Sequence, residues 1–222
     1  DTLEQGLVEV HEAKFSPVFM PKLADLRIVA DKDHPVWQLW FSTPSAKYTG
    51  RTKPTNRSKK GGNPVVVIAH VPTYLSNPEN IARAKSEGLV NYAGRVPQEE
   101  FYRILDMKDD NGVFVVDYGE LRKSESGVID VSDALKHPMV VPFLGGKDRA
   151  DEYLKKHVQV YGNKIGVWHC DDLSDKGSLG RVLFFGGNVS HGDLIGDNGL
   201  SNYSRFVGVR SFVAEGDANP AG

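Results

Sequence analysis

The residues best suited to chemistry in this 222-residue chain are its seven histidines and its single cysteine, Cys170. The histidines are His11, His34, His70, His137, His157, His169 and His191. None of them lies at the i, i+4 spacing that lets two imidazoles bind one metal ion from a helix. Cys170 follows His169, but neighbouring residues of a strand point to opposite faces, so this pair is not a nucleophile with its base. The sequence predicts scattered structural histidines and no catalytic residue.

Acidic residues offer a second kind of chemistry, the binding of calcium through oxygen atoms. The candidates are Asp171, Asp172, Asp175, Asp193, Asp197 and Asn198. Their spacing does not match the calcium-binding loop of an EF-hand. Asp and Asn also stabilise local turns, which explains the same residues without a metal. A structural calcium ion is therefore one alternative and a set of metal-free turns is the other, and the sequence assigns no metal ligand.

A polar segment near the C-terminus is the best candidate for a binding site. Residues 187–204 are mostly Gly, Asn, Ser, Asp, His and Tyr, and strand-like sequences precede and follow them. Small polar residues adapt their hydrogen bonds and tyrosine supplies a large contact area, which is how antibody-type binding loops are composed. We therefore predict a ligand-display surface. Its candidate residues are His169, Asp171, Asp172, Asn188, Ser190, His191, Asp193, Asp197, Asn198, Ser201, Asn202 and Tyr203.

The elements that would position these residues follow from periodicity and from capping signals. Helices are predicted over Pro78–Glu87, from Pro97 to Met107, in a short stretch from Ser132, and over Asp148–Tyr161. Strands are predicted over Val36–Thr43, Val65–Val71, Val113–Tyr118, Lys164–His169, Arg181–Phe185 and Arg205–Val213. Helices and strands occur in blocks rather than in strict alternation, so the predicted fold class is α+β.

A basic segment, residues 47–62, interrupts this pattern. It contains Lys47, Arg51, Lys53, Arg57, Lys59 and Lys60 and no acidic residue. Such a block is compatible with a contact to an anion or a polynucleotide, but charge blocks are more often solvated loops. We therefore expect an exposed loop over Lys47 to Lys60.

The overall composition excludes several classes of partner. A formal net charge of −2 with 40% hydrophobic and 25% charged residues is typical of a globular protein. A nucleic-acid partner favours a strongly basic face, so none is expected. No apolar run approaches the roughly 18 residues of a membrane span, and the first twenty residues lack the pattern of a signal peptide, so no membrane insertion is expected.

Four segments, in order, resemble the formylglycine-generating-enzyme branch of the C-type lectin fold. Arg95–Phe101 resembles its Arg-Leu-Pro-Thr-x-x-Glu-Trp segment, and Ile165–His169 resembles its Gly-Asn-Val-Trp-Glu-Trp strand. Arg181–Asn188 resembles its Arg-Val-Leu-Arg-Gly-Gly-Ser-Trp strand, and Phe206–Arg210 resembles its closing strand. The resemblance implies a single C-type-lectin-like α+β domain over residues 1–222. It also implies an insertion at about 108–163, a display region at about 164–210, and an early strand paired with the last.

Enzymes of this branch bind copper through two cysteines, and this chain has one. It therefore more closely resembles the non-enzymatic variable proteins of diversity-generating retroelements, in which reverse transcription mutates template adenines. That process turns Asn codons into codons for Asn, Ser, Asp, Gly, Tyr and His, the set that dominates residues 187–204. The resemblance implies an adhesin-like ligand-binding protein on a virion tail or cell surface, with a protein or glycan partner, no cofactor and a possible oligomer. The alternatives are an enzyme of the same fold with unidentified chemistry, and a structural protein of a virion or surface layer.

Overall fold

We describe the protein from a computed structural model, which covers residues 1–54, 62–108, 112–175, 177–187 and 191–210. The helices are α1 (Leu3–Glu12), α2 (Met20–Val29), α3 (Pro35–Gln38), the 3-10 helix η1 (Tyr74–Ser76), α4 (Pro78–Ser86), α5 (Gln98–Asp106), α6 (Tyr118–Lys123), α7 (Val131–Ala134), α8 (Val140–Leu144) and α9 (Lys147–Tyr161). The strands are β1 (Phe15–Pro17), β2 (Phe41–Arg51), β3 (Pro64–Ala69), β4 (Gly94–Val96), β5 (Val113–Asp117), β6 (Gly127–Asp130), β7 (Lys164–Trp168), β8 (Ser178–Gly187), β9 (Gly192–Ile195) and β10 (Gly208–Arg210).

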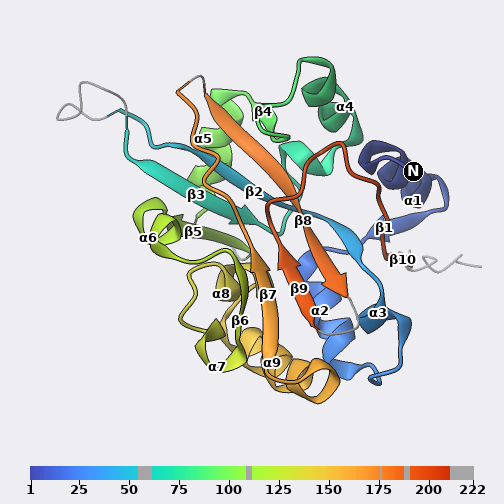
Figure 1. The fold of residues 1–222 in the computed structure, drawn as a ribbon. Coiled ribbons are helices and arrows are strands. Elements are labelled where there is room, and N and C mark those ends of the chain that lie inside the picture. The colour runs from blue at the N-terminus through green and yellow to red at the C-terminus, as the bar shows by residue number, and fades with distance from the viewer. Residues whose placement is uncertain (55–61, 109–111, 176, 188–190, 211–222) are drawn as a thin grey trace, which may run out of the picture.

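One mixed sheet organises the described part of the chain (Figure 1). Its strand order is β5-β3-β2-β8-β9-β7-β6, and β4 also pairs with β8. β7 and β9 run parallel, whereas the other neighbours in the sheet are antiparallel. The first and last strands pair separately, with Phe15 opposite Arg210, which confirms the expected pairing of an early strand with the last one.

Both faces of the sheet are covered, and this explains the uninterrupted apolar run of β3. Val66 and Ile68 pack into one core with α2, α8 and α9, whereas Val65, Val67 and Ala69 pack into a second core with α1, α4 and α5. The side chains of a strand alternate between its faces, so a strand buried on both sides needs apolar residues at every position. β8 is divided in the same way, with Leu183 and Phe185 in the first core and Val182 and Phe184 in the second.

Local signals predicted the helices α4, α5 and α9 to within a few residues. Asn77 caps α4 by accepting a hydrogen bond from the amide of Glu79, and Pro78 occupies the first helical position. The predicted strand at Val36–Thr43 is wrong in its first half. There the side chain of His34 caps the short helix α3, Pro35 begins it, and β2 starts only at Phe41.

The expected exposed loop also begins too early. Residues 47–51 form the end of β2, between β3 and β8, and Lys47 is 1% exposed. A lysine can occupy this position because its ammonium group finds a carboxylate partner, described below. Arg57, Lys59 and Lys60 lie outside the described residues, as do Ser211–Val213 of the last predicted strand.

Two other predicted segments contribute strands to the sheet. Residues 108–163, expected to be an insertion, supply the edge strands β5 and β6. The polar segment 187–204 contains β9, which lies between β7 and β8. None of the helices that we describe is both long and apolar enough to cross a membrane.

Candidate functional site

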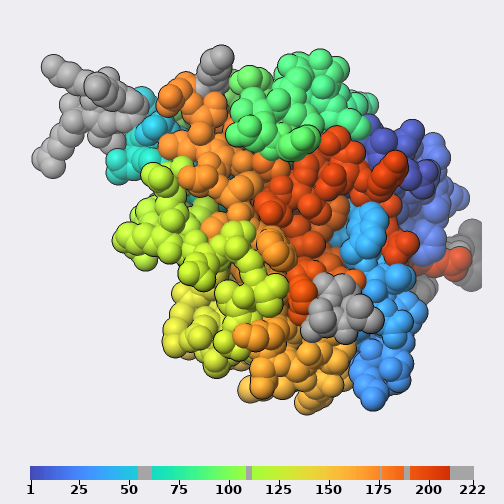
Figure 2. Space-filling view, viewed as in Figure 1, coloured from blue at the N-terminus to red at the C-terminus, as the bar shows by residue number. Residues whose placement is uncertain are grey.

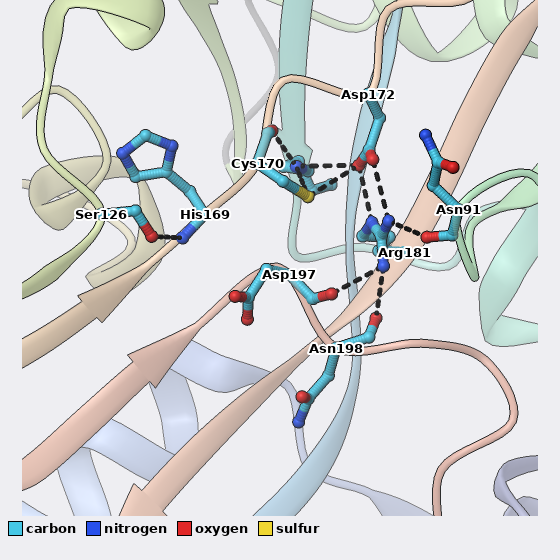
Figure 3. A network of polar contacts seen from close by, with 9 residues as sticks. Asn91, Ser126, His169, Cys170, Asp172, Arg181, Asp197 and Asn198 are labelled. Carbon is cyan, nitrogen blue, oxygen red and sulfur yellow. Dashed lines mark hydrogen bonds and ion pairs between the residues drawn. The ribbon is translucent and has the colours of Figure 1, made fainter.

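A buried arginine joins the segments that surround the predicted display region. Arg181 lies on β8 and is 3% exposed, and its guanidinium group forms a fork with Asp172, with Nε–Oδ2 at 2.6 Å and Nη2–Oδ1 at 2.8 Å. The same guanidinium donates to three main-chain carbonyl oxygens, those of Asn91, Asp197 and Asn198. One side chain thus joins the loop after β7, the loop after β9 and the turn before β4 (Figure 3).

Lys47 of β2 completes this network from the next strand. Its ammonium nitrogen lies 3.1 Å from Oδ2 of Asp172 and 2.7 Å from the carbonyl oxygen of Cys170. The thiol of Cys170 donates to Oδ2 of Asp172 at 3.2 Å. The carboxylate of Asp172 therefore faces two buried cations, Lys47 and Arg181. We refer to Lys47, Cys170, Asp172 and Arg181 as the buried ion cluster.

The pKa values in the buried ion cluster follow from this geometry. Burial alone would raise the pKa of Asp172, but hydrogen bonds from Arg181 and the charge of Lys47 hold it at about 2. Burial lowers the pKa of Arg181, but the hydrogen bonds and charge of Asp172 outweigh this and raise it. Burial raises the pKa of the Cys170 thiol to about 11, although Lys47 opposes the shift. At neutral pH the cluster holds two cations, a carboxylate and a neutral thiol.

Arg181 holds the loop after β9 and the turn before β4 by their main chain only. Figure 3 shows the side chains of Asp197 and Asn198 pointing away from the guanidinium, which contacts their carbonyl oxygens. The side chain of Asn91 also points away from its bonded carbonyl. Replacing these side chains leaves the hydrogen bonds to Arg181 intact, because every residue carries the same carbonyl group.

The outward side chains of these loops gather on one face of the molecule. Figure 2 shows the chain after β9, in orange-red, at the centre of this face, bordered by the green α4–β4 region, the blue start of β2 and the yellow-green α6–β6 region. In the chain after β9, Ser201 and Tyr203 are exposed, Tyr203 at 76%, and Asp197, Asn198 and Asn202 are half-buried. Asp171 is exposed and pairs with Arg122 at 3.3 Å. We call these six residues the display residues.

Other predicted display residues do not reach this surface. Asp172 is 6% exposed because it belongs to the buried ion cluster, and Asp193 is 9% exposed because it accepts a hydrogen bond from the indole of Trp168 at 2.9 Å. His169 is 9% exposed, and its Nε2 lies 3.2 Å from the hydroxyl of Ser124. These three residues support the surface instead of forming it. His191 is half-buried and lies 3.2 Å from Asp193, and Asn188 and Ser190 lie outside the described residues.

Sequence reasoning missed two exposed residues beside the display residues. Tyr92 is 68% exposed, in a turn whose carbonyl accepts from the amide of Leu200 at 3.1 Å. Trp40 is 36% exposed, packs on Phe184, and has the guanidinium of Arg205 at 5.5 Å from its ring centroid. No local pattern marks Tyr92 or Trp40, because only the fold brings them next to the C-terminal segment.

The described residues do not bring together three His, Cys, Asp or Glu side chains that could hold a metal ion. Two of the six candidate calcium ligands are engaged by cations, Asp172 by Lys47 and Arg181 and Asp171 by Arg122. The rings of His137 and His169 lie 5.2 Å apart. However, both nitrogens of His137 form hydrogen bonds, to the carbonyl of Glu125 and to the amide of Met139. This pair is therefore not arranged as a metal site.

Comparison with known proteins identifies the family. A solved structure, described as the accommodation of massive sequence variation in Nanoarchaeota by the C-type lectin fold, is 50% identical to this chain. The similarity covers 90% of each chain, with a TM-score of 0.81. No protein-family model matches the chain, and no curated protein does. The shared fold and half-identical sequence confirm both the α+β C-type lectin fold and the resemblance found in the sequence: the chain belongs to the C-type-lectin-fold variable proteins of diversity-generating retroelements.

Proposed function

We propose that this chain is a non-enzymatic ligand-binding protein whose display residues are varied by a retroelement to change the ligand. The proposal rests on one observation: the side chain of Arg181 contacts Asp197 and Asn198 only through their main-chain carbonyl oxygens. Side chains can then change above a fixed backbone. The ligand is a protein or a glycan on a target surface, and the protein acts from a virion tail or a cell surface.

The chemistry of Cys170 argues against the enzymatic alternative. It is the only cysteine of the chain, and burial raises the pKa of its thiol to about 11. A nucleophile or a copper ligand requires a thiolate, which a lowered pKa favours. Cys170 is instead held as a neutral donor to Asp172. An enzyme would also need titratable groups gathered around a substrate, whereas Asp171, one of the two carboxylates among the display residues, is exposed and paired with Arg122.

The DNA around the gene tests the diversification directly. We expect a second, near-identical copy of the codons for residues 164–210, differing from the gene at adenines of the copy, with a reverse transcriptase gene nearby. The differences should fall on codons of the display residues and spare those of Asp172 and Arg181. The absence of such a copy and of a reverse transcriptase would remove the retroelement from the proposal.

A second prediction concerns tolerance of the surface to change. Four simultaneous replacements, Asn198→Ser, Ser201→Tyr, Asn202→His and Tyr203→Asp, are expected to shift the Tm by less than about 4 °C. Substitutions at surface positions usually change the unfolding free energy by about 0.5 kcal/mol or less, in either direction. Four changes that partly cancel amount to about 1 kcal/mol, which corresponds to about 2–4 °C at this chain length. Thermal unfolding followed by circular dichroism measures the shift.

Leu183→Ala is the matched control, because this fully buried residue of β8 lies beneath the same surface. It should cost about 2–5 kcal/mol and lower the Tm by several degrees more than the four replacements together. A quadruple variant that unfolds as early as Leu183→Ala would show that the display residues are structural.

A further inference from the structure

Tyr92 occupies a backbone conformation that its side chain disfavours. Asn91 and Tyr92 are the two central residues of a tight turn in which Val90 and Ala93 exchange both main-chain hydrogen bonds at 2.9 Å. Their φ angles are +49° and +67°. Such a turn requires positive φ at both central positions, and glycine or asparagine usually fills them. Asn91 fits this preference, whereas a tyrosine in the left-handed region is an outlier that needs a reason.

The fold offers no packing reason for this tyrosine. Its side chain is 68% exposed, so it contributes little to either core. The turn is instead held from below through its main chain, by Arg181 at the carbonyl of Asn91 and by the amide of Leu200 at the carbonyl of Tyr92. Gly199 leaves room for it, because a Cβ at residue 199 would lie 2.7 Å from Cβ of Tyr92. The chain after β9 thus supports a strained turn that presents an aromatic ring to solvent.

We infer that Tyr92 is a fixed aromatic anchor of the binding surface, outside the C-terminal segment and adjacent to the display residues. This inference rests on the proposed ligand-binding function. Strain that persists at an exposed position is a mark of a functional site, since packing does not require it. A tyrosine buries a large area at a low entropic cost and adds a hydroxyl group for hydrogen bonding. The display residues select the ligand, while Tyr92 supplies contact area that all ligands share. Those ligands must offer a surface that covers a phenol ring.

The test uses the full chain displayed on yeast, with Asn198, Ser201, Asn202 and Tyr203 randomised to Asn, Ser, Asp, Gly, Tyr and His. Hen egg-white lysozyme is the probe, chosen as an arbitrary folded protein. In the clones selected for binding, Tyr92→Gly is expected to weaken the affinity at least tenfold, whereas Tyr92→Phe stays within about threefold of its parent. The Tm of Tyr92→Gly should equal or exceed that of the parent, because glycine adopts positive φ without strain.

Lys14→Gly is the matched control. Lys14 is also exposed with a positive φ, +59°, at the junction of α1 and β1, so glycine there relieves the same kind of strain and should leave lysozyme binding unchanged. If the selected clones keep their affinity for lysozyme in Tyr92→Gly, Tyr92 is not an anchor of the binding surface, and the proposed function is unaffected. A Tm loss above about 5 °C in Tyr92→Gly would show a structural role and also overturn the anchor. A library that folds but yields no binder would contradict the proposed function itself.

Discussion

Lowering the pH from 7 to 5 is expected to reduce the unfolding free energy by about 4 kcal/mol through His70 and His157 alone. Burial lowers the pKa of each to about 4, whereas a histidine of the unfolded chain titrates near 6.5. Between pH 6.5 and 4 the unfolded state therefore binds more protons than the folded state. The stability contributed by the neutral imidazoles is present above pH 6.5 and is lost as the pH falls towards 4.

The hydrogen bonds explain why these imidazoles must stay neutral. Nε2 of His70 donates to the carbonyl of Pro142 at 2.7 Å, and Nδ1 accepts from the hydroxyl of Ser45, which is itself the acceptor for the amide of Met20. Nε2 of His157 accepts from the amide of Gly192 at 3.2 Å. A second proton on His157 would place it against the Gly192 amide donor in a buried position. A second proton on His70 would force the Ser45 hydroxyl to give up its hydrogen bond to Nδ1.

Denaturant unfolding between pH 7.5 and 4.5 measures this effect. The unfolding free energy should fall by about 2 to 3 kcal/mol per pH unit near pH 5, since each additional proton taken up on unfolding contributes about 1.4. The pKa of His137 and of His169 is also lowered, mainly by burial. Both histidines therefore also reduce the unfolding free energy as the pH falls. The pKa of Asp172, held near 2, affects stability only below about pH 4.

In His70→Gln the slope of the unfolding free energy against pH should fall by the share of one proton, about 1.4 kcal/mol per pH unit. A slope below about 1 kcal/mol per pH unit in the unaltered protein would contradict the neutral burial of these histidines.

The sequence predicted the elements whose signals are local. α4 has a capping residue, and both α4 and α9 have apolar spacing and a glycine at or shortly after the last turn. α1 carried an equally local signal that could have been used, because Thr2 and Gln5 form a capping box. β9 carried none, since a four-residue strand among polar neighbours is defined by its pairing with β7 and β8.

The residues of the candidate site also fall into those that a local sequence signal predicts and those that it does not. The exposed and half-buried display residues were predictable, because loop composition reflects solvent and recognition. The roles of Asp172 and Lys47 were not, because their partners are distant in the chain; Lys47 and Cys170 are 123 residues apart. A lysine in a basic stretch looks like a loop residue until the fold places a buried carboxylate beside it.

Asp172→Asn is expected to cost about 3–5 kcal/mol of unfolding free energy. Asparagine keeps the shape of the side chain but removes the only carboxylate that faces both Lys47 and Arg181 within the buried ion cluster. Two like charges would then remain buried without a counter-ion, and removing one partner of a buried ion pair costs more than the pair contributes. Urea unfolding at pH 7 measures the loss.

The neighbouring aspartate is the matched control. Asp171 is exposed and pairs with Arg122 at 3.3 Å, so Asp171→Asn should change the unfolding free energy by less than about 1 kcal/mol. Adding Lys47→Met to Asp172→Asn should recover part of the loss, because one of the two uncompensated cations is removed. Equal losses in Asp172→Asn and Asp171→Asn would show that the buried ion cluster does not stabilise the fold.

Asp172→Asn also tests whether Asp172 organises the binding surface or stabilises the whole domain. Asp172 orients the guanidinium that holds the carbonyls of Asn91, Asp197 and Asn198. Hydrogen exchange of the Leu200 amide, which is bonded to Tyr92 in this region, should therefore accelerate in Asp172→Asn more than exchange in β3 does. Equal acceleration of both would mean that Asp172 stabilises the whole domain without organising the display loops. Faster exchange confined to the loops would mean that the proposed binding surface depends on the buried ion cluster for its main-chain arrangement.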